Sequence, residues 1–344
     1  MNIFSRYFSS ATKEQQSLID LSNNNLQQSH EMSHQEDQSI LTDTFKRKHD
    51  YLRISLIEKC NFRCQVNRII DIFTQVGVNK IRLTGGEPLV RKDLIDIVHD
   101  IKSRPQIKTI AMTTNASLLP RKIERLREAG LNQINISLDT LVEAKNQFIT
   151  RRHGGFQQTL KAIDMALNLD FEAVKLNVVA MKGFNEDELC DFVEFVKDRA
   201  MEVRFIEFMP FDQNDWNNKK LLPYFQIRKL IEDKYKLTRN QDGPHATSKT
   251  FSIEGYKGTV GFISSMSEHF CGGCNRMRIT ADGNLKICLF DNREINLREM
   301  IDQGMSDSDI LLQVREHLYK KHFSHGGVDS ILQRENRSMT RIGG

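Results

Sequence analysis

The sequence predicts an α/β protein: a partial (β/α)6 TIM-like barrel followed by a C-terminal α+β extension that closes the barrel. Short apolar strands alternate with amphipathic helices from residue 51 to about residue 208, which is the pattern of βαβ units and a parallel sheet. Polar or sulfur-bearing residues follow or end several different strands, and this is typical of the mouth of a barrel. A doubly wound sheet, the alternative, would gather such residues at one switch point.

Six strands and the helices between them are expected. The strands are runs of apolar and β-branched residues, and the helices have apolar residues at a period near 3.6. We expect strands at Tyr51–Leu56, Lys80–Leu83, Thr109–Thr113, Gln133–Ser137, Val174–Val179 and Val203–Phe208. We expect helices at Asp93–Ser103, Arg121–Ala129, Phe156–Leu169 and Glu186–Arg199. The residues at the strand ends are Cys60 and Cys64, Gly85–Glu87, Thr113–Asn115, Ser137 with Asp139, and Met209.

The chain divides into three predicted regions. Residues 1–44 are rich in Ser, Gln, Asn and His without a sustained apolar period, so they are predicted to be disordered. Their first thirteen residues contain Arg6 and Lys13 but no acidic residue, which is typical of a mitochondrial transit peptide; a plain disordered tail is the alternative. Residues 45–240 form the predicted barrel. Residues 241–344 form the C-terminal region, which begins in a predicted loop at 239–249 and has apolar runs at 250–253 and 259–263.

The composition argues against two classes of partner. Of the 344 residues, 39% are hydrophobic and 27% are charged, and the formal net charge of +4 does not indicate a nucleic-acid binder. No apolar run approaches the ~20 residues needed to span a bilayer, so no membrane partner is expected. A mildly basic balance suits a protein that places a few cations around an anionic small molecule.

Five of the six cysteines lie in two tight groups, which favours metal or iron–sulfur ligation over a disulfide framework. In the second group, Cys271 and Cys274 form a CxxC turn, and Cys288 follows after thirteen further residues. Three thiolates can hold zinc, or three corners of an iron–sulfur cluster with one iron left open, and the spacing alone leaves both interpretations standing. The sixth cysteine, Cys190, falls inside a predicted helix and is expected to be a core residue.

The first group, Cys60 and Cys64, becomes informative beside the end of the next strand. The residues there are Gly85, Gly86 and Glu87. The two glycines allow close backbone approach of a ligand, and the glutamate can meet an ammonium group. This arrangement resembles radical S-adenosylmethionine (SAM) enzymes, which bind a [4Fe-4S] cluster through CxxxCxxC after the first barrel strand. In this chain the third cysteine position is occupied by Asn67.

Longer motifs extend the pattern: YLRISLIEKCNFRC, NKIRLTGGEPLVRKDL, MTTNA, INISLDT, VRFIEFMPF, FCGGCNRMRITADGNLKICLF and the terminal Gly-Gly. Together they resemble the eukaryotic GTP 3′,8-cyclases of molybdenum cofactor biosynthesis over roughly residues 43–344. The resemblance implies that a barrel cluster cleaves SAM to a radical, which abstracts a ribose hydrogen of GTP to give 3′,8-cyclo-7,8-dihydro-GTP. It also implies a second [4Fe-4S] cluster whose open iron binds the guanine end.

The resemblance implies roles for individual residues. Cluster ligands are implied at Cys60, Cys64, Cys271, Cys274 and Cys288, and SAM contacts at Gly85, Gly86, Glu87, Ser137 and Met209. GTP contacts are implied at Arg53, Lys80, Arg82, Thr113, Lys175, Arg204, Arg276 and Arg278, and the tail Gly343 and Gly344 is implied to assist catalysis. Arginines from several strands suit a triphosphate, and the sequence contains no GxxxxGK[ST] P-loop.

Partners and location also follow from the resemblance. Besides GTP, an electron donor and the next enzyme of the pathway are expected to meet this protein, and a homodimer is one option. The expected location is the mitochondrial matrix, with the cytoplasm as the alternative.

The chain departs from the family pattern directly after Cys64. In the family, one residue, an aromatic, the third cysteine and a loop follow, whereas here Gln65 leads straight into VNRIIDIFTQVG, the pattern of a later part of the first helix. We therefore expect an internal deletion, an incomplete barrel cluster and impaired catalysis. The alternatives are a non-catalytic GTP- or partner-binding isoform that retains only the C-terminal cluster, and a zinc-structured barrel protein without iron.

Three histidines and the tryptophan are expected to have structural rather than catalytic or binding roles. His317, His322 and His325 are expected to be surface histidines rather than metal ligands. Trp216 is expected to pack against or cap its own loop rather than bind guanine.

Overall fold

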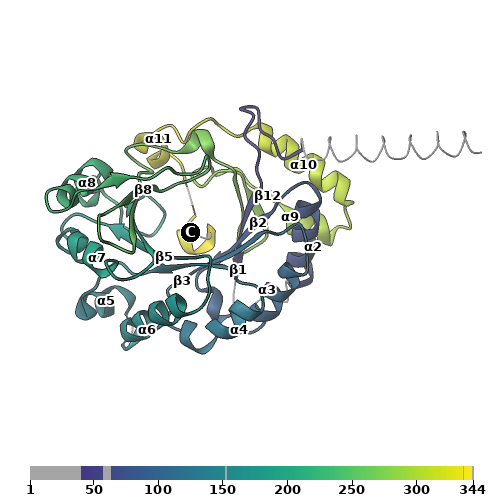
Figure 1. Cartoon of the computed structure of the whole chain (residues 1–344). Coiled ribbons are helices and arrows are strands. Elements are labelled where there is room, and N and C mark those ends of the chain that lie inside the picture. The colour runs from purple at the N-terminus through teal and green to yellow at the C-terminus, as the bar shows by residue number, and fades with distance from the viewer. Residues whose placement is uncertain (1–39, 57–62, 152, 336, 343–344) are drawn as a thin grey trace, which may run out of the picture.

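The computed structural model of the chain describes residues 40–56, 63–151, 153–335 and 337–342. In these residues a twelve-stranded sheet curves into an open barrel, with helices around its outer face (Figure 1). The strand order is β12-β11-β10-β1-β2-β3-β4-β5-β6-β9-β8-β7. The predicted partial barrel is therefore confirmed.

The six central strands are parallel and follow one another in sequence order, as predicted. Their bounds are β1 Tyr51–Leu56, β2 Lys80–Gly85, β3 Thr109–Thr114, β4 Gln133–Ser137, β5 Ala173–Ala180 and β6 Glu202–Glu207. Neighbouring parallel strands need a crossover of a dozen or more residues, which the intervening helices supply. Because all six strands run the same way, their C-terminal ends meet at one rim of the barrel.

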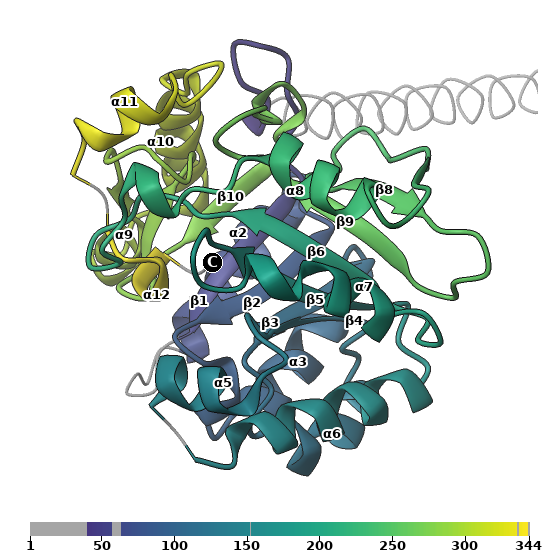
Figure 2. The ribbon, with the colours of Figure 1, turned by 90° about the vertical axis from the view of Figure 1, so that its left-hand side faces the viewer.

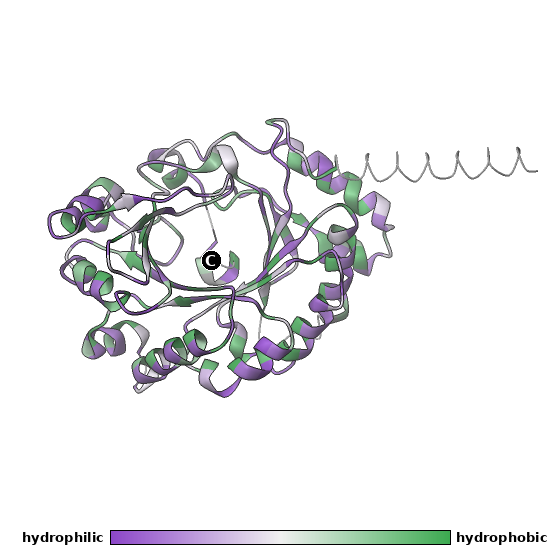
Figure 3. Ribbon diagram, in the orientation of Figure 1, coloured by the Kyte–Doolittle hydropathy of each residue, from purple (hydrophilic) through white to green (hydrophobic). Residues whose placement is uncertain are grey.

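The helices outside the sheet bury one apolar face each. Their bounds are α2 Arg63–Gln75, α3 Leu94–Lys102, α4 Ile123–Glu128, α5 Glu143–Thr150, α6 Gly155–Asn168, α7 Leu189–Phe195 and α8 Tyr224–Glu232. Short 3-10 turns lie at η1 Pro88–Val90, η2 Leu119–Arg121, η3 Glu186–Glu188 and η4 Asn218–Lys220. In α3, for example, the buried residues Leu94, Ile97, Val98 and Ile101 follow helical spacing. Figure 3 shows the same mixture of hydrophilic and hydrophobic residues on each of these helices.

Two predictions around α7 were wrong. The expected helix Glu186–Arg199 is α-helical only to Phe195, because the carbonyls of Val196 and Lys197 accept hydrogen bonds from Gly258 and Lys257 instead of continuing the helix. Cys190 is half-buried rather than a core residue. Its sulfur faces the Leu230 carbonyl of α8 at 3.8 Å.

The C-terminal region extends both edges of the barrel sheet. β9 (Thr259–Ile263) pairs parallel with β6 and continues into β8 (Lys249–Ser252) and β7 (Thr238–Arg239). β10 (Arg276–Ile279) pairs parallel with β1 and continues into β11 (Asn284–Lys286) and β12 (Ile295–Asn296). Among the described strands, β12 and β7 are the two edges of the sheet and do not pair with each other. The extension therefore lengthens the sheet but does not close it by hydrogen bonds.

Packing, rather than strand pairing, fills the opening. The last helices are α9 Leu297–Asp302, α10 Asp307–Tyr319, α11 Val328–Leu332 and α12 Met339–Ile342. They all appear on the left of Figure 2, whereas Figure 1 shows that α9 and α10 lie outside the ring of strands and α12 lies within it. Ile342 of α12 is fully buried in a small apolar cluster with Phe211, Met266, Phe290 and Ile331. This cluster is separate from the main core between sheet and outer helices.

Part of the predicted disordered tail is ordered. Residues 1–39 lie outside the described residues, but Leu41 and Asp43 are buried. None of the helices that the structure describes is both long and apolar enough to cross a membrane.

Candidate active site

A cavity of about 520 Å³ lies against the inner face of the sheet. Seven of the eight residues predicted to contact GTP line it: Arg53, Lys80, Arg82, Lys175, Arg204, Arg276 and Arg278. Met209 and the cysteines Cys271, Cys274 and Cys288 line the same cavity. The barrel thus brings together residues that are more than 200 positions apart in the sequence.

Strand register arranges five of the cations in two rows. Arg53 of β1 pairs with Arg82 of β2 on one side and with Arg278 of β10 on the other. Two residues earlier on each strand, Tyr51 pairs in the same way with Lys80 and Arg276. Since side chains two apart on a strand share a face, both rows point into the barrel. The rows lie toward the N-terminal ends of the strands, away from the rim that carries Gly85 and Ser137.

Lys175 and Arg204 face these rows from the other side of the barrel. Lys175 Nζ lies 2.9 Å from Glu202 Oε2, and Arg204 donates to Asn177 Oδ1 at 2.6 and 3.0 Å. Burial lowers the pKa of Arg204 to about 10, although Glu202 opposes the shift. The two cations are therefore held in place by polar neighbours and remain on the cavity wall.

The central arginines repel one another and lack a full set of partners. Within the described residues, Arg53 Nε and Arg278 Nε are buried without a hydrogen-bond acceptor. Burial, together with the neighbouring Arg278, holds the pKa of Arg53 well below its ordinary value. Burial and Arg276 likewise lower the pKa of Arg278 to about 10. Buried donors of one charge sign need an anion to satisfy them, so this wall is built to bind a polyanion.

Tyr51 belongs to this site, and the sequence reasoning missed it. Burial raises the pKa of its phenol, but Arg82, Arg53 and Lys80 outweigh burial and bring the pKa to about 7. Arg82 Nε donates to Tyr51 Oη, and Lys80 Nζ lies 5.1 Å from the centre of the ring. A signal was present in the sequence, because Tyr51 precedes Arg53 by two positions on a strand and so shares its face.

Thr113 is the predicted GTP contact that does not line the cavity. Its hydroxyl accepts a hydrogen bond from Arg82 Nη1 at 3.4 Å. In this structure Thr113 therefore stands behind Arg82 and helps to orient its guanidinium.

The three C-terminal cysteines are free thiols, and two of them, Cys271 and Cys274, have N–H donors beside their sulfur atoms. Cys274 accepts a hydrogen bond from Lys321 Nζ at 3.5 Å. Burial disfavours its thiolate, but Lys321 and Arg276 outweigh burial and lower the pKa of Cys274 to about 7. Burial raises the pKa of Cys271, while the backbone N–H of His325 opposes this. Hydrogen bonds to sulfur are a feature of thiolate ligation, so the donor set fits an iron–sulfur cluster.

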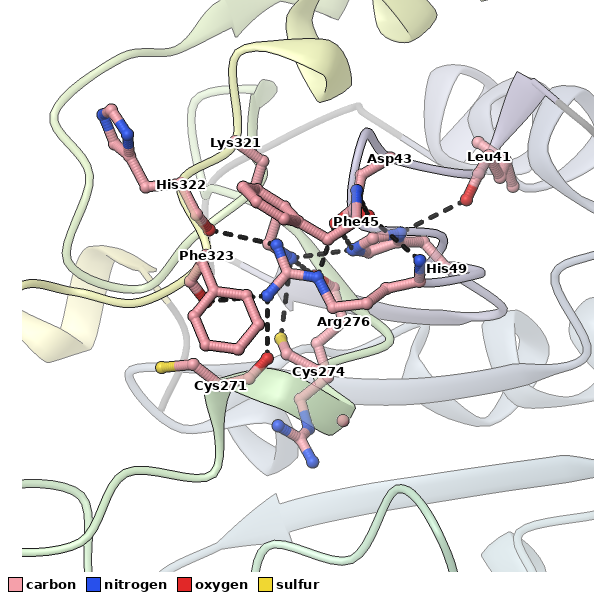
Figure 4. A network of polar contacts seen from close by, with 12 residues as sticks. Leu41, Asp43, Phe45, His49, Cys271, Cys274, Arg276, Lys321, His322 and Phe323 are labelled. Carbon is pink, nitrogen blue, oxygen red and sulfur yellow. Dashed lines mark hydrogen bonds and ion pairs between the residues drawn. The ribbon is translucent and has the colours of Figure 1, made fainter.

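The geometry of the thiols is not that of a site for one ion. No group of three His, Cys, Asp or Glu side chains in the described ranges converges closely enough to hold a single metal ion. Cys271 and Cys274 point in different directions along the cavity wall (Figure 4).

The backbone conformation at the C-terminal end of β2 requires a glycine at position 85. Its φ is +132°, and a Cβ at this position would lie 2.3 Å from the carbonyl oxygen of Leu56 on β1. In contrast, a Cβ on Gly86 would meet no atom within 4 Å, so open space lies above this residue. The two glycines therefore differ in function: the first permits strand pairing, and the second leaves room at the rim.

We predict that Gly85→Ala lowers the free energy of unfolding by about 2–4 kcal/mol, because it combines backbone strain with a clash against backbone. Gly86→Ala is the matched control and should change stability by less than about 0.5 kcal/mol. Urea unfolding followed by circular dichroism measures both. Equal urea midpoints for the two variants would contradict the requirement for glycine at position 85.

Glu87 ties two strand ends together. Its carboxylate accepts hydrogen bonds from Thr114 Oγ1 at 2.6 Å, Asn115 N at 2.8 Å and Leu89 N at 3.1 Å. This joins the predicted GGE and TTN motifs into one rim structure. The contact of Glu87 with an ammonium group stays a prediction, as do the SAM contacts of Gly85 and Gly86.

The next strand ends contribute less to the cavity. Ser137 is exposed at the end of β4 and does not line the cavity. Asp139, just beyond it, accepts from Val179 N at 2.8 Å, and burial raises its pKa to about 6.

Some predicted site residues lie outside the described residues. These are Cys60, Gly343 and Gly344. Cys64 is exposed at the start of α2. Asn67, at the position of the expected third cysteine, donates through Nδ2 to Asp100 Oδ2 of α3 at 2.9 Å, on the outer side of the barrel, while its Oδ1 is buried without a partner among the described residues.

The histidine prediction was wrong for two of three residues. His317 and His325 are buried, whereas His322 is exposed. His325 lines the cavity and contacts Ser265 O through Nε2 at 2.9 Å, because the chain after α10 turns back over the cavity. The prediction for Trp216 is confirmed, since its Nε1 donates to Phe208 O at 3.2 Å within its own loop.

Two family models match this chain in succession. The model described as Radical SAM superfamily matches residues 64–196, and the model described as Molybdenum Cofactor Synthesis C matches residues 201–326. The first match begins at Cys64, after β1, so the first strand and Cys60 lie outside it.

Similar proteins come from several kingdoms. Molybdenum cofactor biosynthesis protein 1 of Dictyostelium discoideum is 49% identical over 88% of this chain and 52% of its own length. The mitochondrial GTP 3′,8-cyclase of Arabidopsis thaliana is 46% identical over 89% and 84%, and the GTP 3′,8-cyclase of Syntrophomonas wolfei is 40% identical over 88% and 100%. The chain therefore spans about half of the Dictyostelium relative but most or all of the other two.

The alignment with the Dictyostelium relative contains more positions than the number of residues of this chain that it covers. The Dictyostelium alignment runs over 329 positions, whereas 88% of 344 residues is about 303 residues. About 26 positions of that alignment therefore have no counterpart in this chain.

A solved structure supports the fold. Streptococcus suis SuiB, in its complex with S-adenosylmethionine, superposes with a TM-score of 0.54 at 15% identity, over 85% of this chain and 77% of that one. At this identity the likeness concerns the fold alone. The sequence matches go further: the chain belongs to the GTP 3′,8-cyclase family of the radical SAM superfamily.

Proposed function

We propose that this chain binds GTP in the cationic cavity as the substrate of the GTP 3′,8-cyclase reaction, the first step of molybdenum cofactor biosynthesis, which yields 3′,8-cyclo-7,8-dihydro-GTP. The observation that carries the proposal is the wall of eight cations, the seven predicted ones and Lys286, with three thiols around the same cavity. We also propose that this chain turns over slowly, because only two thiols, Cys60 and Cys64, are available to hold its barrel cluster.

Each part of the cavity has a proposed task. The row of Arg53, Arg82 and Arg278 binds the triphosphate, because Arg53 Nε and Arg278 Nε are buried without an acceptor and match phosphate oxygens. Lys175 and Arg204 close the anion site from the opposite strands. The C-terminal cysteines, at one end of the same cavity, hold a [4Fe-4S] cluster against the guanine end. When bound, the barrel cluster and SAM supply the radical that starts the reaction.

The proposed defect lies at the rim of the barrel. Asn67 is bonded to α3 and is a poor ligand for iron in any case. The alignment positions without a counterpart support a missing segment in this chain, and the family match that starts only at Cys64 supports a departure from the family pattern before α2. A four-iron cluster held by two thiols would expose two irons to solvent and exchange.

We predict near four iron atoms per chain after anaerobic reconstitution with iron and sulfide, rather than eight. Iron and acid-labile sulfide analysis, with zinc measured in parallel, decides the number. Eight irons would contradict the incomplete barrel cluster. One zinc and no iron would contradict the proposed function and favour the zinc-structured alternative.

The second candidate is a non-catalytic GTP- or partner-binding isoform. The intact cavity beside an incomplete barrel site favours it. Isothermal titration with GTP, combined with an assay for SAM cleavage, separates the two functions. Binding without any cleavage supports the isoform, and cleavage coupled to loss of GTP supports the enzyme.

Location and partners are part of the proposal. The basic, acid-free start of the chain and the mitochondrial Arabidopsis relative support the mitochondrial matrix. An electron donor and the next enzyme of the pathway would meet the protein there. Import of the full chain into isolated mitochondria, with cleavage of its first residues, is the test.

A further inference from the structure

The segment Leu41–His49 forms a hairpin that packs beside the C-terminal cysteines. Thr42 and Lys48 form an antiparallel bridge, and His49 N donates to Leu41 O at 2.8 Å. Asp43 Oδ1 holds the turn by accepting from the backbone N–H of Phe45 at 2.9 Å and of Arg47 at 3.0 Å. Neither family model covers this hairpin.

Arg47 fastens the cysteine segment to the chain that follows α10. Its guanidinium donates to Cys271 O at 2.8 Å, Phe323 O at 2.9 Å and His322 O at 3.0 Å. The Asp43 carboxylate accepts from Arg47 Nε at 2.6 Å and neutralises its charge. One buried side chain therefore joins three segments that are far apart in the sequence.

Lys321 occupies the centre of this network (Figure 4). It is 4% exposed, and its Nζ lies 2.8 Å from His49 Nε2, 3.5 Å from Cys274 Sγ and 3.4 Å from Arg276 O. An ammonium group has three N–H donors, and here each one has an acceptor. His49 Nδ1 faces Leu41 O at 3.2 Å, so the neutral imidazole donates there and accepts from Lys321.

The groups around Lys321 show which of them can compensate its buried amino group. Among the described residues no carboxylate forms an ion pair with it. The Asp43 charge is already matched by Arg47. A buried ammonium needs a compensating negative charge, and Cys274 is the group in contact that can carry one. Lys321 Nζ thus donates to the Cys274 sulfur at 3.5 Å from a buried position.

We propose that Lys321 is a positioning residue for the C-terminal iron–sulfur cluster, held on the Cys274 thiolate by His49 of the hairpin. The inference rests on the proposed function, since it requires that the three cysteines hold a cluster. Outer-shell partners fix the orientation and the basicity of metal ligands, and a nearby cation favours the more negative, reduced state of a cluster.

The test compares variants of the full chain after anaerobic reconstitution. Lys321→Met should lower the reduction potential of the cluster, alter the EPR spectrum of its reduced form and speed the loss of iron to a chelator by about 10-fold or more. Lys321→Arg, which keeps the charge, should restore most of the potential. Lys320→Met, at the exposed neighbouring position, is the control and should match the unmodified chain.

Histidine variants keep the test decisive if Lys321→Met does not fold. His49→Leu removes the acceptor and should change the spectrum and the potential in the same direction as Lys321→Met. His49→Gln retains an acceptor and should restore them. A folded Lys321→Met with unchanged potential, spectrum and iron loss overturns the proposal, as do identical His49→Leu and His49→Gln proteins. An unmodified chain that takes up no iron would overturn the proposed function as well, and is seen before any variant is compared.

Discussion

After reconstitution with iron and sulfide, this chain will cleave SAM at least about 100-fold more slowly than a family member with three barrel-cluster cysteines. The reason is the proposed absence of one of the three cysteines that bind the barrel cluster directly, since losing even an outer-shell partner costs about 10–100-fold in metal affinity or activity. Asn67 does not replace it, because an amide oxygen is a poor ligand for iron and the Asn67 side chain lies against Asp100 on the outer side of the barrel. The assay is 5′-deoxyadenosine formation under dithionite, measured by chromatography.

The matched control is an insertion. The segment that family members carry between the second barrel cysteine and the first helix is placed after Cys64, once with its cysteine and once with that cysteine changed to alanine. Only the first insertion should restore cleavage. A rate in the unmodified chain close to that of an intact relative, or equal restoration by both insertions, would show that two thiols are sufficient.

The second large effect is expected at the cationic wall, where Arg278→Met should weaken GTP binding about 10- to 100-fold, because a hydrogen bond to a charged group is worth ~1.5–3 kcal/mol. The same change should stabilise the unliganded fold by about 1 kcal/mol, since it removes a buried, repelled charge and keeps the volume of the side chain. Burial and Arg276 lower the pKa of Arg278 to about 10, which is the sign of that repulsion. Titration calorimetry and urea unfolding measure the two effects.

Arg121→Met serves as the control for this prediction. Arg121 is exposed in η2, away from the cavity, so its loss should leave both affinity and stability within about 0.5 kcal/mol. A decrease in both stability and affinity for Arg278→Met would show that the arginine supports the fold rather than the anion. Raising the salt concentration should narrow the difference in affinity, because phosphate contacts are screened.

Local pattern predicted the barrel, and the resemblance to the family supplied most of the residues of its cationic wall. The six strands are short apolar runs whose bounds differ from the predicted ones by at most two residues, because burial on both sides leaves little freedom in such runs. Arg276 and Arg278 are two positions apart on one strand and line the same cavity, as a shared strand face requires. Motifs at strand ends are local signals, so they were readable without knowledge of the packing.

Features that depend on distant contacts were not predicted. The hairpin at 41–49 was assigned in part to a disordered tail, because its partners, such as Cys271 and Phe323, are more than 220 residues away. His325 was expected at the surface, since nothing local shows that the chain turns back over the cavity. The end of α7 at Phe195 likewise depends on hydrogen bonds to Gly258, which no helical period contains.

The hydrogen bonds of Arg47 to Cys271, His322 and Phe323 also constrain the order in which parts of the chain assemble during synthesis. A ribosome makes Arg47 early, but its acceptors, the carbonyls of Cys271, His322 and Phe323, appear 224 to 276 residues later. At roughly 5–20 residues per second, the guanidinium waits for tens of seconds without its partners. The hairpin closes on its own local hydrogen bonds, but its attachment to the cysteine segment is completed only after translation has nearly ended. The proposed cluster site at Cys271 and Cys274 is therefore completed late, after the barrel strands have been made.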